Sequence, residues 1–443
     1  MGDVNLKTLN VQLRKFLPKH LDFPSDVSEG AVLFLQECLN ALHHPEFESG
    51  STIINLQSVI DFTWERLNSV HWRDVPFSQR KMYAAASLLK SIAIVNSLSS
   101  VEGEKDIKGP LQNSLKSADM GLLLGADFRE ELTNIAHILS STLSSDSSNQ
   151  SPQAISIEKE AGSFNPTNRI HYNELTVLEC PSMEFFHFHH FKPRIPVKIS
   201  GCMSHWPALK KWCDVSYFRQ LAGSRTVPVE LGSNYLESNW SQSLMTLSTF
   251  IDKYINCESS SPISENATPT IGYLAQHQLF DQIPELKKDI FEPEYCCLME
   301  NPDTDPEGTD VNAWFGPKGT VSPLHYDPKH NLLCQVVGTK QVVLFSPEDS
   351  NNVYPHEGTL VSNSAMVDPE NPDFEKFPKF QEATGYTCLL KAGEMLYIPP
   401  KWWHHVRSLS TSFLLVSGGC RIEDNLNSET TRAFQHSLTN PKR

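Results

Sequence analysis

The sequence lacks the features that mark membrane-spanning, secreted and nucleic-acid-binding proteins. No stretch approaches the run of about 18 consecutive apolar residues that a membrane-spanning helix needs. The first residues, MGDVNLK, also lack the apolar segment of a secretory signal, so we expect neither a membrane partner nor secretion. Basic residues are in the minority, with 37 Lys and Arg against 52 Asp and Glu and a formal net charge of -15 at pH 7. An acidic surface repels phosphate groups, which predicts no direct nucleic-acid binding and favours a basic protein or peptide as partner.

Cysteine is also sparse. The 10 cysteines include no CxxC pair, and the adjacent pair is Cys296 and Cys297. This spacing suits neither a zinc knuckle nor a disulfide framework. We therefore interpret the cysteines as reduced thiols of an intracellular protein, packed mainly as small apolar residues.

Two regions that differ in their pattern of apolar residues follow one another along the chain. With 39% hydrophobic and 20% charged residues, the composition is that of a globular protein, and 443 residues correspond to two or three domains of about 150 residues. In residues 1–140 apolar side chains recur every three or four positions, which predicts helices. Hydroxyl side chains suited to capping their first turns stand at Ser25, Ser28, Ser51 and Ser78. This half contains no titratable cluster or glycine loop, so we interpret it as a module that docks a protein partner or regulates the rest.

A serine-rich, weakly hydrophobic stretch at 141–163 predicts a linker. Residues 164–420 then change to short β-rich runs separated by Pro, Gly and Asn. The clearest runs are 196–200, 226–230, 331–337 and 341–345. Many short strands at regular spacing indicate a sandwich or barrel, so the predicted fold class is α+β, with a helical N-terminal domain before a β domain. A Ser-, Pro- and Glu-rich insertion at 257–269 and a polar tail at 421–443 complete the predicted organisation.

The sharpest chemical feature is the triplet His325-Tyr326-Asp327. On a strand, residues two apart point to the same face, so an imidazole and a carboxylate can reach one metal ion while Tyr326 faces away. A turn, an apolar strand and a second histidine site, His404 and His405, follow later in the chain. Two histidines and one carboxylate on one face of a metal bind non-haem Fe(II) and leave positions open for substrates. The triplet alone is a weak signal, and its combination with the second histidine site carries the prediction.

Lys340 lies between these two segments, on a predicted strand where it alternates with Val342 and Leu344. A lysine that points into an apolar barrel is costly unless an anion pairs with it. The distal carboxylate of a dicarboxylic cosubstrate is the natural partner. The alternative is an edge-strand charge that prevents aggregation, and the nearby histidines and carboxylate favour the first interpretation.

Four motifs resemble those of the JmjC-domain, 2-oxoglutarate- and Fe(II)-dependent oxygenases. They are NAWFGP at 312–317, SPLHYD at 322–327, LFSP at 344–347 and IPPKWWH at 398–404. The similarity runs from about residue 165 to residue 416. The resemblance implies that a JmjC double-stranded β-helix, the cupin-like jelly roll, follows the helical domain. It also implies Fe(II) as the metal, with 2-oxoglutarate and O2 as cosubstrates.

The resemblance assigns the site residue by residue. The implied metal ligands are His325, Asp327 and His404. The implied 2-oxoglutarate pocket consists of Lys340, Tyr273, Ser322, Asn331 and Gln276. Trp314 is placed by the metal, and Glu230 and Trp240 toward the peptide, where a carboxylate can grip a guanidinium through two parallel hydrogen bonds. Core packing is the alternative for both tryptophans, and a solvated strand end is the alternative for Glu230.

One departure from the family pattern concerns the last strand. The family closes it with two tryptophans near the chain end, whereas this chain has Gly418 and Gly419 and continues as a polar tail. Loss of a pocket-lining ring at Gly418 weakens one wall of the implied cosubstrate pocket, which puts the affinity for 2-oxoglutarate in question.

Other histidines offer weaker metal sites. The cluster His187, His189 and His190 places alternate histidines on one face but lacks a carboxylate at matching spacing. The pair His43-His44 is weaker still. His405 stands where the family usually has an aromatic residue.

The interpretation we favour is a protein oxygenase that hydroxylates C-3 of arginyl residues in basic nuclear or ribosomal proteins. Its chemistry is the oxidative decarboxylation of 2-oxoglutarate at Fe(II), and the protein holds the target C–H bond near the metal and excludes water. The availability of Glu230 and the acidic chain favour arginine as the target. The alternative at the same centre is demethylation of methyl-lysine in a histone H3 tail, for which an aromatic cage or polar oxygens would be needed around the ammonium.

Two further classes of function stay open. An endopeptidase or aminopeptidase that clips histone tails at methylated Arg or Lys needs a metal-activated water and a general base, and the chain has no His-Glu-x-x-His segment. A non-catalytic chromatin scaffold would use the helical half as an adaptor. The resemblance alone implies a nuclear, chromosome-associated location, with a cytoplasmic pool as the alternative, because no Lys/Arg-rich import signal occurs.

Overall fold

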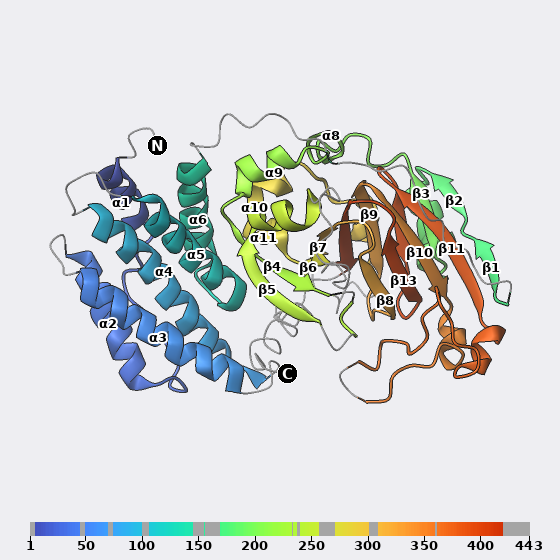
Figure 1. Cartoon of the computed structure of the whole chain (residues 1–443), viewed down its shortest axis with the longest axis horizontal. Coiled ribbons are helices and arrows are strands. Elements are labelled where there is room, and N and C mark those ends of the chain that lie inside the picture. The colour runs from blue at the N-terminus through green and yellow to red at the C-terminus, as the bar shows by residue number, and fades with distance from the viewer. Residues whose placement is uncertain are drawn as a thin grey trace, which may run out of the picture.

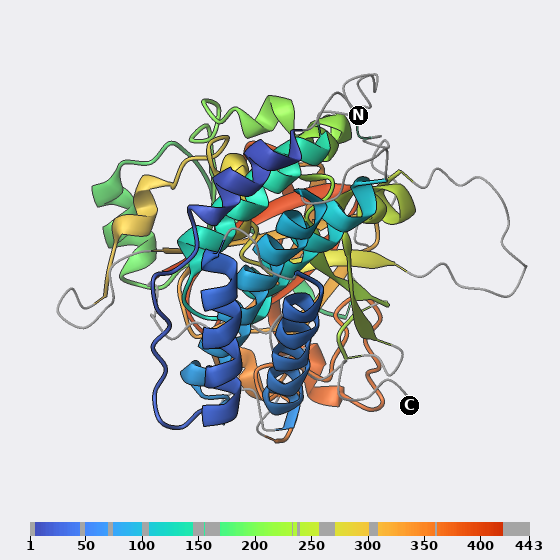
Figure 2. The ribbon, with the colours of Figure 1, turned by 90° about the vertical axis from the view of Figure 1, so that its left-hand side faces the viewer.

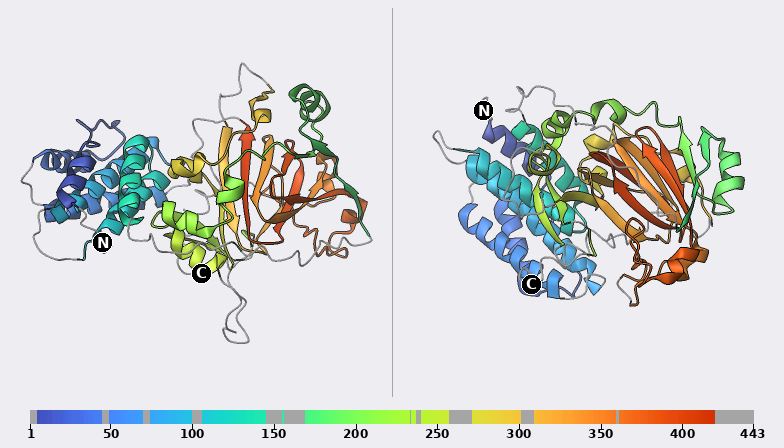
Figure 3. Two further views of the ribbon diagram at one scale, coloured as in Figure 1. Left: turned by 90° about the horizontal axis from the view of Figure 1, so that it is seen from above. Right: turned by 45° about the vertical axis from the view of Figure 1, so that its right-hand side comes forward.

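A computed structural model describes residues 5–44, 49–69, 74–99, 106–144, 155, 169–232, 234–236, 240–256, 271–300, 309–358 and 361–419. Within these ranges a helical part and a β part lie side by side (Figures 1 and 3). The predicted insertion and polar tail lie outside the described residues, as does the predicted linker apart from 141–144 and 155. The predicted α+β class, with helices first and strands after them, is confirmed.

The helical part is built around one apolar helix, α4. Its helices are α1 (Leu6–Arg14), α2 (Glu29–His43), α3 (Ser49–Ser69), α4 (Phe77–Ser99), α5 (Lys108–Leu124) and α6 (Arg129–Ser144). Because α1, α2, α3 and α5 pack around it, α4 is almost completely buried, with Leu88, Leu89 and Ile92 in the core. Seen from the helical side, α2 and α3 stand together at the front (Figure 2).

α4 is also the one described helix whose length and composition would suit a membrane span. However, 78% of its most apolar window is buried inside the protein. The neighbouring helices therefore already cover its apolar surface, as they do for a helix at the centre of a folded domain.

The predicted capping serines locate one helix start, although the Ser28 side chain makes no capping hydrogen bond. α2 begins directly after Ser28, as predicted, whereas α3 and α4 begin before Ser51 and Ser78. α6 continues to Ser144, past the predicted boundary at residue 140, because Leu143 extends its buried stripe.

The β part is a sandwich of two sheets, which fits the predicted jelly roll. In the described part of the chain, one sheet has the order β1-β11-β10-β13-β8 and the other the order β2-β3-β12-β9-β14-β7-β6-β4-β5. The strands are β1 (His171–Glu174), β2 (Val177–Glu179), β3 (Val197–Ser200), β4 (Thr226–Leu231), β5 (Ser241–Thr246), β6 (Gly272–His277), β7 (Thr309–Gly316), β8 (Val321–His325), β9 (Asn331–Val337), β10 (Thr339–Phe345), β11 (Thr384–Lys391), β12 (Met395–Ile398), β13 (Trp403–Ser408) and β14 (Ser412–Gly419). Short helices connect them: α7 (Met183–Phe186), α8 (Ala208–Lys211), α9 (Val215–Ala222), α10 (Leu247–Phe250), α11 (Leu279–Gln282) and α12 (Pro284–Lys287), with π-helical turns at His187–Phe191 and Ile251–Ile255.

Strand β9 shows why strands of the β part could be predicted from the sequence. Its observed bounds are those of the predicted run at 331–337, and every residue in it is buried. Leu333 belongs to the core between the two sheets, whereas Leu332 and Cys334 belong to the core on the other face of the larger sheet. A strand covered on both faces has a continuous apolar sequence.

A buried polar seam joins the two parts. The Asp119 carboxylate of α5 lies 2.7 Å from Nη2 of Arg225, which immediately precedes β4. The carboxylate also accepts hydrogen bonds from the Thr226 backbone N–H at 2.7 Å and from Nε2 of Gln282 at 3.0 Å. Asp119 is 0% exposed and Arg225 is 1% exposed. A charge pair at this depth is costly to break, because the remaining charge would have no counter-ion.

Candidate active site

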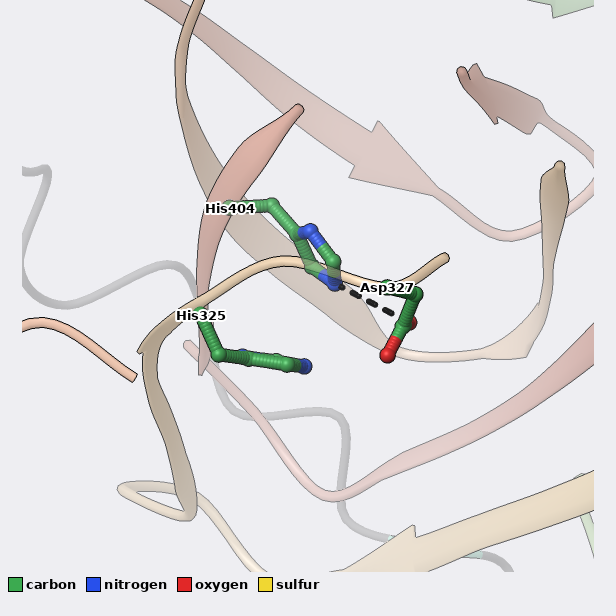
Figure 4. Close-up of side chains that lie close together, drawn as sticks. All are labelled: His325, Asp327 and His404. Carbon is green, nitrogen blue, oxygen red and sulfur yellow. Dashed lines mark ion pairs between the residues drawn. The ribbon is translucent and has the colours of Figure 1, made fainter. Parts of the chain in front are cut away.

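Two neighbouring strands bring the predicted metal ligands together. β8 ends at His325, and the antiparallel register places His404 of β13 directly opposite it. The two imidazole centroids are 4.2 Å apart, and ligand atoms of His325, Asp327 and His404 all lie within 4.8 Å of one another. Figure 4 shows the three side chains converging, with Nε2 of His404 3.7 Å from Oδ2 of Asp327. Among the described residues, no other group of three or more His, Cys, Asp or Glu side chains could hold a metal ion.

Backbone contacts fix the tautomer of both histidines. Nδ1 of His325 lies 2.7 Å from the Pro323 carbonyl oxygen, and Nδ1 of His404 lies 3.0 Å from that of Trp402. Because a carbonyl oxygen only accepts, each Nδ1 carries the proton and each Nε2 presents its lone pair. Burial, reinforced by His325, lowers the pKa of His404 to about 4, so this ring is neutral at pH 7. Two imidazoles that present Nε2 and one carboxylate form a donor set that suits divalent iron.

Asp327 reaches the histidines from a loop and not, as predicted, from the strand, because β8 ends at His325. Its carboxylate accepts a hydrogen bond from Nδ2 of Asn331 at 2.5 Å, and its carbonyl accepts one from the Lys401 N–H at 2.8 Å. Asn331 was expected to bind the cosubstrate, and in this structure it holds a predicted metal ligand. Tyr326 faces away as predicted and packs against Trp403, with ring centroids 4.8 Å apart.

Lys340 is a buried cation that has no carboxylate partner among the described residues. The residue is 1% exposed, and Nζ donates hydrogen bonds to the Tyr273 hydroxyl at 3.1 Å and to Oγ of Ser408 at 2.9 Å. Burial lowers the pKa of Lys340 to about 7. Strand β10 lies between β11 and β13, so the edge-strand alternative is wrong. Hydroxyl groups compensate a buried charge only in part, which makes this a place where an anion would be stabilised.

Ser408 is a site residue that the sequence analysis missed. It follows His404 and Val406 at alternate positions of β13 and lies opposite Lys340 in the register with β10. Its hydroxyl also accepts a hydrogen bond from Oγ1 of Thr320 at 2.7 Å. Counting by twos from His404 along the strand would have found it, since alternate residues share a face.

The other residues predicted to bind the cosubstrate lie on strands near Lys340. Ser322 of β8 hydrogen-bonds to Tyr273 of β6, so these two side chains join the Lys340 cluster. Gln276 lies further along β6, at a bulge, with a φ of 46°. A bulge of this kind redirects a side chain relative to its strand neighbours.

Of the residues predicted to face the peptide, Glu230 lies on β4 of the larger sheet and Trp240 directly precedes β5. Nε1 of Trp240 donates a hydrogen bond to Oε2 of Glu230 at 3.3 Å. Glu230 lies opposite Tyr273 in the register of β4 and β6, and after burial its negative charge is the next cause that raises the pKa of the Tyr273 hydroxyl. Trp314 of β7, which was expected beside the metal, is partly buried and packs against the apolar core between the sheets.

The connection between β4 and β5 also contacts a residue that pairs with His325, one of the predicted metal ligands. The Tyr235 hydroxyl lies 3.2 Å from Oγ of Ser364. Ser364 in turn forms an antiparallel bridge with His325. Trp240 directly precedes β5, at the end of this connection.

The remaining histidines have structural positions. In the turn His187–Phe191, Nδ1 of His189 and Nδ1 of His190 hydrogen-bond to backbone carbonyls. Nε2 of His43 does the same with the Pro18 carbonyl at 3.1 Å. His405 is buried, and burial lowers the pKa of this ring to about 4.

The last strand forms despite its departure from the family pattern. β14 runs to Gly419, and Gly418 pairs with Asn331 of β9 and with Asp310 of β7. The glycine therefore borders Asn331, the residue that holds Asp327.

Comparisons with known proteins show which family the chain resembles. Residues 182–419 match the family described as a cupin-like domain. The chain is 38% identical over 416 residues to lysine-specific demethylase 8 of Danio rerio, which covers 90% of this chain and 97% of that protein. It is 39% identical over 360 residues to Jumonji C domain-containing protein 5 of Drosophila melanogaster, covering 80% and 84%. It is also 30% identical over 247 residues to the human bifunctional peptidase and (3S)-lysyl hydroxylase JMJD7, covering 48% and 74%.

These matches extend beyond the β part, because the alignment with the Danio rerio protein covers nearly the whole chain. The chain belongs to the JmjC family of cupin-like oxygenases.

Proposed function

We propose that this protein is an Fe(II)- and 2-oxoglutarate-dependent oxygenase that hydroxylates an arginyl side chain of a basic nuclear or ribosomal protein. The observation that carries the proposal is the group His325, Asp327 and His404 beside the uncompensated cation of Lys340. The overall reaction consumes 2-oxoglutarate and O2. It yields succinate, CO2 and an alcohol where the substrate had a C–H bond.

The side chains of this chain divide the work. When bound, Fe(II) together with 2-oxoglutarate and O2 supplies the oxidising chemistry for the C–H bond. His325, Asp327 and His404 would hold the metal through two Nε2 atoms and one carboxylate oxygen. Lys340 would pair with the distal carboxylate of the cosubstrate, and Tyr273 would hydrogen-bond beside it. The residues around the pocket then have to place the target carbon near the metal and exclude water.

Glu230 supports arginine as the target. It lies opposite Tyr273 in the register of β4 and β6, and its carboxylate is held by the Trp240 indole N–H. A carboxylate can bind a guanidinium through two parallel hydrogen bonds, which an ammonium group cannot reproduce. The formal net charge of -15 favours association with a basic peptide.

Mass spectrometry of peptide products tests the proposal. The protein is incubated with Fe(II), 2-oxoglutarate, O2 and an arginine-containing basic peptide. We expect a product heavier by one oxygen atom, with the modification on arginine and succinate formed in equal amount. His404→Ala is the control and is expected to give neither product, since one of three metal ligands is lost. An unmodified peptide with the wild-type protein, under conditions where the peptide binds, would contradict the proposal.

Demethylation of methyl-lysine is the second candidate, because the relatives that cover most of this chain include proteins named lysine-specific demethylase. The same assay with a methyl-lysine peptide would then give a product lighter by one methylene group. Peptide cleavage, an activity in the name of the human relative, would appear as two fragments. Fragments that persist with His404→Ala would assign cleavage to something other than the metal ligands.

A further inference from the structure

A polar network outside the metal centre reaches one of its ligands through Trp402. The indole Nε1 of Trp402 donates a hydrogen bond to the Arg194 carbonyl oxygen at 3.0 Å. The carbonyl oxygen of Trp402 accepts a hydrogen bond from Nδ1 of His404 at 3.0 Å. The Arg194 backbone is therefore linked to His404 through a single intervening residue.

The side chain of Arg194 connects, through Glu300, to the segment that holds the Asp327 carboxylate. Its guanidinium binds Glu300, with Nη2 2.7 Å from Oε1 and 3.0 Å from Oε2, and Nε 3.1 Å from Oε1. Oε1 of Glu300 also accepts a hydrogen bond from Nε2 of His330 at 2.9 Å. His330 directly precedes Asn331, whose amide holds the Asp327 carboxylate.

His330 is fixed on its remaining sides as well. Its Nδ1 lies 2.7 Å from the Tyr397 hydroxyl, and its ring stacks on Phe191 with centroids 4.2 Å apart. Burial alone would raise the pKa of Glu300, but hydrogen bonds from His330 and Arg194 hold it below its usual range. The carboxylate is thus charged at neutral pH and can bind both neighbours at once.

We propose that Arg194, Glu300 and His330 form a brace that sets the position of Asp327 relative to His404, and that Glu300 and His330 are positioning residues of the metal centre. This inference rests on the metal centre of the proposed function. The brace joins the two segments that bring the ligands, one through His330 and the other through the Arg194 carbonyl. It also gives a role to the turn His187–Phe191, because Phe191 supports the ring of His330.

The brace should raise the affinity of the protein for a divalent metal. Ligands that are fixed before the metal arrives lose less conformational freedom when it binds, and partners of metal ligands contribute about 10- to 100-fold to affinity. The network is partly exposed, with side-chain exposures of 50% for Arg194 and 38% for Glu300. Its contribution to folding should therefore be small, which separates an effect on the metal from an effect on stability.

Titration of the metal-free full chain with Co(II), followed by the visible absorption of the bound ion, tests the inference without any turnover. We expect Glu300→Ala to bind Co(II) about tenfold more weakly than the wild type and to alter the spectrum, with a nearly unchanged melting temperature. Glu300→Gln, which keeps an acceptor but no charge, should lie between them. Asp252→Ala is the matched control, since it breaks a comparable ion pair with Arg219, at 2.6 Å, on segments that carry no metal ligand.

A second variant tests whether the residues act as one unit. His330→Ala should weaken Co(II) binding like Glu300→Ala, and the double variant should bind no more weakly than the weaker single variant. Wild-type affinity and spectrum in Glu300→Ala would overturn the brace, as would equal losses in Glu300→Ala and Asp252→Ala. Failure of the wild-type chain to bind Co(II) would instead overturn the metal centre of the proposed function, and the brace with it.

Discussion

Among the described residues, Arg225 and Lys340 are cations that are almost completely buried, and their surroundings differ. Arg225, at the seam between the helical and β parts, has a carboxylate partner in Asp119 and donates a further hydrogen bond to the Gln282 carbonyl at 2.8 Å. Lys340, in the core between the sheets, has only the hydroxyl groups of Tyr273 and Ser408. Both residues are 1% exposed. The two residues are equally buried, but only Arg225 has a counter-ion, as expected for a structural ion pair at the seam and for a proposed anion-binding site at Lys340.

The presence or absence of a counter-ion decides whether a buried charge can bind an anion. A buried ion pair with all its hydrogen bonds made has nothing left to offer a ligand, and it is strongly destabilising only when broken. A buried lysine without a counter-ion destabilises the folded protein until an anion arrives, so the binding of the anion recovers that free energy. Four experiments test this contrast, in order of decreasing expected effect.

Breaking the seam should have the largest effect. Asp119→Ala leaves Arg225 charged and buried, and we expect the free energy of unfolding to fall by about 3–5 kcal/mol. Urea denaturation followed by circular dichroism measures this change. The double variant Asp119→Ala/Arg225→Met is the control and should recover part of the loss. A single variant as stable as the wild type would show that the two parts do not depend on this pair.

Removing the charge of Lys340 should instead increase the free energy of unfolding. In Lys340→Met the buried charge is replaced by an apolar chain, and we expect the free energy of unfolding to rise by about 1–4 kcal/mol, as when buried charges are replaced by apolar side chains. The affinity for 2-oxoglutarate should fall at least about 30-fold, as expected when one partner of a buried charge pair is removed. Calorimetric titration and urea denaturation give the two numbers, and Lys379→Met, at an exposed position, is the matched control. Loss of stability in Lys340→Met would contradict the comparison.

The pH dependence of cosubstrate binding should be moderate. Because burial lowers the pKa of Lys340 to about 7, the free protein loses this charge as the pH rises above 7. The affinity for 2-oxoglutarate should then fall, by at most about tenfold per pH unit. Protonated Lys340 also costs stability below pH 7, and that cost should be relieved as the pH rises from 7 toward 10.5, the ordinary pKa of lysine.

Lys340→Arg is the control for this pH series, since a guanidinium stays charged throughout the range. Whatever its absolute affinity, its binding should not show the decrease above pH 7. A parallel decrease in both proteins would assign the pH dependence to another group.

Removing one hydroxyl should have the smallest effect. Ser408→Ala takes away one of the two hydrogen bonds to Nζ of Lys340 and leaves the Tyr273 hydroxyl in place. We expect the affinity for 2-oxoglutarate to fall by about fivefold, which corresponds to about 1 kcal/mol, the typical net contribution of one hydrogen bond. Calorimetry at pH 6, where Lys340 is largely protonated, measures it. A loss as large as that in Lys340→Met would mean that Ser408 contributes more than a hydrogen bond.

The sequence was sufficient for features that depend on local period. The buried strand at 331–337 and the histidines at 325 and 404 stand in patterns that repeat every two residues, and the structure places them accordingly. Lys340 could be placed in the core because its strand neighbours Val342 and Leu344 are apolar at alternate positions.

The rest depended on contacts between distant parts of the chain. Asp119 and Arg225 are 106 residues apart, and no local pattern connects them. Asp327 lies beside the two histidines as predicted, but the predicted reason was wrong. It was expected on a strand, whereas it lies in a loop held by Asn331 and Lys401. Loop geometry of this kind follows from tertiary hydrogen bonds, which a single sequence does not display.

The two adjacent histidines of β13 bear on how insertions and deletions would be tolerated. If the strand slipped by one residue, His405 would take the place of His404, and an imidazole would still face Asp327. However, Arg407 would then replace Val406 in the apolar core, and Leu409 would replace Ser408 beside Lys340. His405 therefore does not give the strand a second usable register. Val406 and Ser408, which follow it, fit only the register that is observed.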